Sequence, residues 1–149
     1  MNNKRILPPT IFEIAAVALV ALHLTLPIAI LVRYPLNLAG IAFILFGSVL
    51  NIWADQLFKK LNTTVKPYGS PSAFVVQGPF AWCRNPMYLG MLSILFGISI
   101  VCGSLASFIV PIVFWIIIRT RFIPLEERSM LTAFGEEYVN YTKKVPRWM

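Results

Sequence analysis

A polar, turn-rich segment between two apolar stretches carries the densest set of residues that could bind a ligand or do chemistry. It reads Gly78-Pro-Phe-Ala-Trp-Cys-Arg-Asn-Pro-Met-Tyr-Leu-Gly90 and combines aromatic rings, a guanidinium, an amide and a phenol. Pro79 and Pro86 fix φ and punctuate the backbone just before a new apolar helix. A simple linker between apolar helices does not need this mixture. The segment therefore predicts one wall of a binding site.

A second polar cluster, Leu125-Glu-Glu-Arg128, could face this wall. Glu126 and Glu127 follow Pro124, which predicts that both lie in the first turn of a C-terminal helix. There a carboxylate stabilises the helix dipole by a few tenths to ~1 kcal/mol, so one interpretation is purely structural. The alternative is that one of the pair binds a ligand. Adjacent helical residues project about 100° apart, so the two carboxylates should not share a role.

Other polar residues near the apolar segments have competing explanations. Arg119 and Arg121 end an apolar stretch, where they either snorkel to lipid headgroups or hold an anionic acceptor. Asp55 lies one turn before Lys59, so an ion pair between them is the simple account. His23 has no metal-ligand partner nearby, and we interpret it as a hydrogen-bonded core histidine.

The bulk composition is that of an integral membrane protein. Of the 149 residues, 58% are hydrophobic and 13% are charged, and the mean hydropathy is +0.73. A soluble domain is nearer half apolar and a quarter charged. The length allows a single domain, residues 1–149. Cys83 and Cys102 show no metal-ligand spacing, so no metal is expected.

Four apolar blocks predict an all-α protein with about four transmembrane helices, because about 20 apolar residues cross a bilayer. The last two blocks are short, and a re-entrant pair that does not cross is the alternative. Ser93 and Gly97 have the small-residue spacing that permits close helix packing. The expected segments are spans at 11–32, 36–58, 88–102 and 105–118, a loop at 62–87 and a tail helix at 124–145.

The charges predict the orientation of these spans. An even number of spans places twelve of the 13 lysines and arginines on the side of both termini and only Arg33 on the other. Basic residues favour the cytoplasmic side, so both termini and the candidate site should face the cytosol. The net charge of +7 then favours anionic headgroups as partners, not nucleic acid.

The tail from Pro124 onward differs from the spans. Apolar and aromatic side chains recur at three-to-four spacing, which predicts an amphipathic helix on a surface. Gly135 lies in its middle and should break or kink it.

These motifs together resemble the isoprenylcysteine carboxyl methyltransferase family, whose relatives are the phospholipid methyltransferases. The resemblance rests on the 78–90 segment, on Glu126-Glu127, on Phe134-Gly-Glu-Glu-Tyr138 and on Val145-Pro-Arg147, in this order and spacing. It covers roughly residues 62–149. The first two spans match only in being apolar.

The resemblance implies a membrane methyltransferase that uses S-adenosylmethionine without a Rossmann domain. It implies a cofactor site at the loop before the third span, with Glu126 as its acidic contact. A family arginine that binds substrate falls on Phe122, so Arg121 or Arg119 would take over that role. Independently of the resemblance, an amine acceptor would need a proton sink, for which Asp55 or Glu127 is the candidate. The remaining cofactor-binding residues implied by the motif are Ser72, Ala73, Phe74, Val75, Phe80, Asn85, Pro86, Met87 and Tyr88.

The sequence departs from the family pattern at one position, where the usual Arg-His-Pro-x-Tyr reads Arg84-Asn-Pro-Met-Tyr88. Asparagine keeps a hydrogen-bonding side chain but cannot titrate, so it cannot act as a general base. The function implied is methyl transfer to a lipophilic acceptor that enters from the bilayer. The alternative is a non-catalytic membrane module of the same fold that binds lipid or a partner helix.

Overall fold

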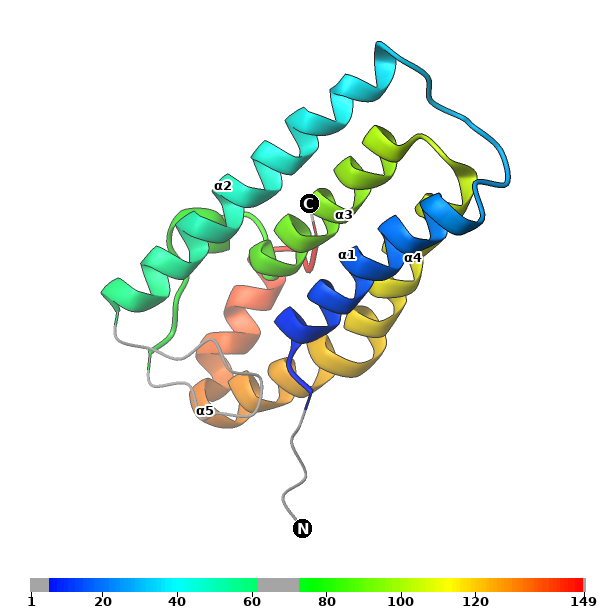
Figure 1. Ribbon diagram of the computed structural model, residues 1–149. Helices are drawn as coiled ribbons and strands as arrows, with labels where there is room; N and C mark the ends of the chain where they lie inside the picture. Colours follow the sequence, from blue (N-terminus) through cyan, green and yellow to red (C-terminus); the bar gives the residue numbers. More distant parts are fainter. Residues whose placement is uncertain (1–5, 62–72, 149) are drawn as a thin grey trace.

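The computed structural model describes residues 6–61 and 73–148, and within them four apolar helices form an antiparallel bundle (Figure 1). The described residues contain no strand beyond one isolated bridge between Ile30 and Ser104. Helix α3 packs against each of the other three helices and is the most buried of them. This arrangement confirms the predicted all-α membrane fold. The helices are α1 (Pro8–Thr25), α2 (Ala39–Lys60), α3 (Pro86–Cys102) and α4 (Leu105–Ile117).

Three helices in the described residues are long and apolar enough to cross a bilayer: α1, α2 with its preceding turn, and the long helix that begins with α4. Helix α3, at 17 residues, is shorter. It nevertheless extends to the end of the bundle at which α1 stops. There, Leu31 N–H, in the segment after α1, donates to the carbonyl of Gly103, just after α3 (2.7 Å). This reach favours a crossing α3–α4 hairpin over a re-entrant pair.

The first span ends earlier than the sequence predicts. The prediction was residues 11–32, but α1 stops at Thr25. Pro27 explains the difference, because a proline cannot continue a helix and disfavours the helical conformation at the residue before it. Leu26 accordingly leaves the helix at φ −141° and ψ 62°. The other three predicted spans agree with α2, α3 and α4 to within a few residues.

Two glycine pairs let α2 and α3 approach closely. A Cβ atom on Gly40 would overlap the carbonyl oxygen of Gly97, and one on Gly47 would overlap that of Gly90. Ser93 lies between these crossings and donates to a backbone carbonyl of α2 (3.1 Å). The predicted close packing at Ser93 and Gly97 is confirmed, and it fixes the position of the α3 N-terminus against α2.

Replacing Gly47 with leucine should destabilise the bundle. The added side chain meets a backbone carbonyl that cannot turn aside, and overpacking of this kind costs about 1–3 kcal/mol or more. Thermal unfolding in detergent measures the loss. Ala42→Leu, on the exposed side of the same helix, is the matched control and should leave stability unchanged. Equal unfolding temperatures for both variants would contradict the close α2–α3 contact.

The tail continues from α4 without a break. A π-helical turn (Ile118–Phe122) joins α4 to α5 (Ile123–Lys144), and Ile123 N–H donates to the carbonyl of Ile118. The predicted tail helix at 124–145 agrees with α5 to within one residue, and Glu126 lies in its first turn. Its N-terminus is not free, however, because backbone hydrogen bonding runs through from α4. Gly135 takes φ 49° and ψ −123°, which confirms the predicted kink. Figure 1 shows α5 folded across the end of the bundle at which α1 begins.

Candidate functional site

The candidate site lies where the segment before α3 meets the beginning of α5 and the C-terminal residues. A short 3-10 turn (Gly78–Ala81) leads into this segment, and Gly78 supplies the positive φ (57°) that the entry requires. Pro86 then begins α3 at a position where its missing N–H leaves no bond unmade. The chain thereby fixes Asn85 and Tyr88 on either side of the helix start.

Tyr88 and Glu126 form the contact between the two halves of the site. The Tyr88 hydroxyl donates to Glu126 Oε1, and the Tyr88 side chain is buried. Glu126 lies in polar α5, beyond the apolar stretch that crosses the membrane. Burial raises the pKa of Glu126 to about 7; the bond from Tyr88 lowers it, and the charge of Glu127 raises it. Within the described residues Glu126 has no ion-pair partner.

Glu127 faces a different set of groups. Arg147 binds both of its carboxylate oxygens, through Nε (2.9 Å) and Nη2 (2.7 Å), and Arg84 Nη1 lies 3.1 Å from Oε1. The bond to Glu127 is the main cause of a raised pKa at the Arg147 guanidinium. The two carboxylates therefore differ as the 100° helical rotation predicts. Glu126 is left for a further partner, whereas Glu127 is held between two arginines.

The last residues tie the loop before α3 to α5. We call residues 145–148 the C-terminal strap. Arg84 N–H donates to the carbonyl of Pro146 (3.0 Å), and Asn85 Nδ2 donates to the carbonyl of Arg147 (2.9 Å). The Cys83 thiol also points to the Arg147 carbonyl (3.8 Å). Sequence reasoning gave Arg147 no role, although its place in the Val-Pro-Arg motif was the available signal.

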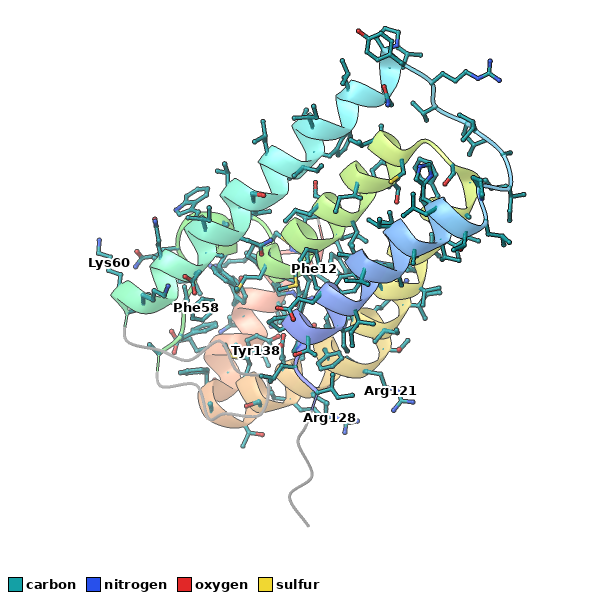
Figure 2. All side chains as sticks on the ribbon, viewed as in Figure 1. Phe12, Phe58, Lys60, Arg121, Arg128 and Tyr138 are labelled. Atoms are coloured by element: carbon teal, nitrogen blue, oxygen red, sulfur yellow. The ribbon has the colours of Figure 1, made fainter. Side chains whose placement is uncertain are left out.

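An aromatic wall closes the other side of the site. Phe74 stacks on Phe134 (ring centroids 5.0 Å apart) and meets Tyr138 and Tyr141 edge-on at 6.1 and 5.3 Å. The Tyr141 hydroxyl donates to the carbonyl of Phe80 (2.6 Å). Tyr138, labelled beside α5 in Figure 2, is buried at this wall. Sequence reasoning recognised three of these rings as motif or amphipathic residues, but it did not place them at the site.

The structure brings most of the predicted cofactor-binding residues to this region. Val75 and Phe80 are buried in one apolar cluster with Ala54, and Met87 packs on that cluster. Ala73 is half-buried. Ser72 lies outside the described residues.

The two arginines predicted to hold the acceptor lie elsewhere. Arg119 is exposed, with its guanidinium 4.9 Å from the ring centroid of Trp115. Arg121 is exposed too, and Figure 2 shows it projecting away from the bundle. No hydrogen bond or ion pair among the described residues joins either of them to Glu126 or Glu127. Their role as acceptor ligands stays a prediction.

Two further polar residues have the structural explanations that the sequence favoured. His23 Nδ1, in the last turn of α1, and Ser104 Oγ, just before α4, are hydrogen bonded (3.0 Å). Asp55 forms an ion pair with Lys59 (2.6 Å). Both are confirmed as structural contacts.

The fold and the site are those of an integral membrane protein. The chain belongs to the phospholipid methyltransferase family. The family matches residues 36–137, which include α2, α3, α4 and the Tyr88–Glu126 contact and end before the C-terminal strap. This match confirms the family resemblance seen in the motifs.

Proteins whose sequences are similar to this chain include two named methyltransferases. The chain is 32% identical over 114 residues to protein-S-isoprenylcysteine O-methyltransferase of Rattus norvegicus, covering 74% of this chain and 40% of that protein. It is 33% identical over 113 residues to the protein of that name in Schizosaccharomyces pombe, covering 72% and 47%. An uncharacterised protein of Haemophilus influenzae is 35% identical over 63 residues, 42% of this chain and all of that one.

A solved structure has the same fold. It is that of the eukaryotic intramembrane Ras methyltransferase, isoprenylcysteine carboxyl methyltransferase, with a TM-score of 0.70 and 25% identity. The likeness covers 97% of this chain and 52% of that one. The chain thus spans about half or less of the isoprenylcysteine methyltransferases it matches.

Proposed function

We propose that this protein is a membrane methyltransferase that transfers a methyl group from S-adenosylmethionine to a lipophilic acceptor. The observation that carries the proposal is the Tyr88–Glu126 pair, a partly buried carboxylate with no cation beside it in the described part of the chain, next to an aromatic wall. The names of the relatives support the reaction class.

The polar groups of the site fit this cofactor. S-adenosylmethionine carries a sulfonium, an ammonium and a carboxylate. A partly buried carboxylate without a cation suits the positive groups, because a charge-assisted hydrogen bond is stronger than a neutral one. Arg84 Nε is buried and has no hydrogen-bond partner among the described residues, so it can take the ligand carboxylate. Tyr138 and Phe134 offer flat apolar surface for an adenine ring.

The chain's own residues would act by positioning. When bound, S-adenosylmethionine supplies a methyl group activated by the sulfonium, and in-line displacement needs alignment and a dry site. Glu126 would hold the positive end of the cofactor while Tyr88 orients the carboxylate. Glu127 is engaged by two arginines, which supports a positioning role for it over a catalytic one.

Isothermal titration of the detergent-solubilised protein with S-adenosylhomocysteine tests this function. We expect saturable binding with one site per chain. Well-folded protein that binds neither S-adenosylhomocysteine nor S-adenosylmethionine would overturn the proposal and favour the non-catalytic membrane module.

The affinity for S-adenosylmethionine should rise with pH through about 7. The raised pKa of Glu126 means that its carboxyl group is protonated below that value, so a cationic ligand must displace a proton to bind. Below the pKa we expect the affinity to fall by about ten-fold for each pH unit. Titration between pH 5.5 and 8 measures the slope, and Glu126→Gln should abolish it. A slope shared by both proteins would assign the proton to the ligand.

We also propose that the end of the bundle that holds the site faces the cytosol, as the distribution of basic residues favours. Arg33→Cys and Lys143→Cys lie at opposite ends of the bundle and can be placed in a Cys102→Ser background, in which the remaining Cys83 is buried. A membrane-impermeant maleimide added to intact cells should label the first and not the second. The reverse pattern would invert the topology.

A further inference from the structure

An apolar groove of about 620 Å³ lies over α3 between α2 and α4, on the outside of the bundle. Phe43 of α2, Phe96 of α3 and Phe108 of α4 line it and touch edge-on, with centroids 5.5 and 5.7 Å apart. The hydroxyl of Ser93 in the groove already donates to a backbone carbonyl, so it requires no polar ligand. The lining of the groove therefore suits a hydrocarbon chain.

The guanidinium of Arg119 lies at one end of this groove. Trp115 lines the groove, and its ring carries the Arg119 guanidinium at 4.9 Å, a distance at which cation and ring attract. Between Phe108 and Arg119 the helix rises roughly 16 Å at ~1.5 Å per residue. That is about half of the ~30 Å hydrocarbon core, or the depth of one leaflet. The groove and Arg119 together match a long chain with an anionic headgroup.

We propose that this groove binds an acyl chain of an anionic membrane phospholipid, whose phosphate meets Arg119. The site is separate from the Tyr88–Glu126 contact and does not depend on methyl transfer. A helix of a second copy fits less well. Helix contacts in membranes favour small residues, as the glycines between α2 and α3 illustrate, whereas this groove is rimmed by phenylalanine, isoleucine and tryptophan.

Fluorescence quenching by brominated lipids reads occupancy of the groove directly, because Trp115 lies in it. Replacing Trp53, Trp82 and Trp148 by phenylalanine leaves Trp115 as the single reporter. The full chain is titrated in phosphatidylcholine nanodiscs with phosphatidylglycerol or phosphatidylcholine that carries brominated acyl chains. We expect the anionic lipid to quench with about five-fold higher apparent affinity, the effect of one basic residue near an anionic headgroup.

The variants at Arg119 decide the assignment. Arg119→Gln should remove the preference for the anionic lipid, and Arg119→Lys should keep it. Arg121→Gln is the matched control, an exposed arginine two residues away, and should leave the preference intact.

Native mass spectrometry of lipid adducts on the chain with all its tryptophans checks the same ratio. Equal quenching by both lipids in the parent protein would overturn the proposal, as would equal losses at Arg119 and Arg121. A dimer that resists quenching by either lipid would assign the groove to a second copy and overturn it too.

Discussion

Replacing Glu126 with glutamine should weaken binding of S-adenosylmethionine about ten-fold or more. The carboxylate is partly buried against Tyr88, so a positive group of the ligand that binds there loses a charge-assisted partner and stays unpaired. Such a loss costs roughly 1–3 kcal/mol, and each 1.4 kcal/mol is a factor of ten in affinity. Isothermal titration at pH 8, where the parent carboxyl group is ionised, gives the ratio directly.

Glu136→Gln is the control for this experiment, since it removes an exposed carboxylate from the same helix. It should leave affinity and stability unchanged. Glu127→Gln should keep cofactor affinity within a few-fold, because its carboxylate is already bound by Arg84 and Arg147. Equal losses of affinity at Glu126 and Glu127, at equal thermal stability, would refute the assignment of Glu126.

Replacing Glu127 with glutamine should lower the free energy of unfolding by about 2 kcal/mol, between the values for exposed and buried ion pairs. The variant leaves two guanidiniums without their carboxylate, and the Arg84 side chain is only 15% exposed. The sequence alone suggested a smaller loss, from the helix dipole. That estimate does not apply, because α5 continues from α4 and has no free N-terminus there.

A double-mutant cycle separates this contact from general damage. Arg147→Gln should destabilise less than Glu127→Gln, because Arg84 still pairs with the carboxylate. The double variant should lose less than the sum of the two single losses, since residues in one ion-pair network couple. Thermal unfolding in detergent measures all four proteins. Strictly additive losses would contradict the bidentate contact.

The fold was predictable because its signals are local. Apolar length marks each span, and Pro86 and Gly135 mark a helix start and a kink in the structure as they do in the sequence. The early end of α1 was also marked locally, by Pro27, but the apolar run continues past it and hid the break. Local patterns thus gave the order of elements more securely than their ends.

The site was only partly predictable, because its contacts join distant parts of the chain. Arg84 and Glu127 are 43 residues apart, and Arg147 lies 20 residues beyond Glu127. No periodicity in the sequence reports such pairs. The π-turn that joins α4 to α5 changes the helical phase just before the glutamates, and a regular helix would not anticipate it.

Asn85 shows how a departure from the family pattern can keep a structural role. Its amide donates to the carbonyl of Arg147 and so helps to hold the C-terminal strap. A hydrogen-bond donor is all that this contact requires. The absence of a titrating group at this position is compatible with a methyl transfer that needs alignment rather than a base.

Transfer of a radiolabelled methyl group tests the central claim most directly. The purified protein is incubated in lipid vesicles with S-adenosylmethionine labelled on its methyl group and a total lipid extract, to which isoprenylated cysteine is added in parallel. The account predicts label in the organic phase, lost in Glu126→Gln and retained in Glu136→Gln. Folded protein that binds S-adenosylhomocysteine yet labels no lipophilic product, or that labels it equally well without Glu126, would contradict it.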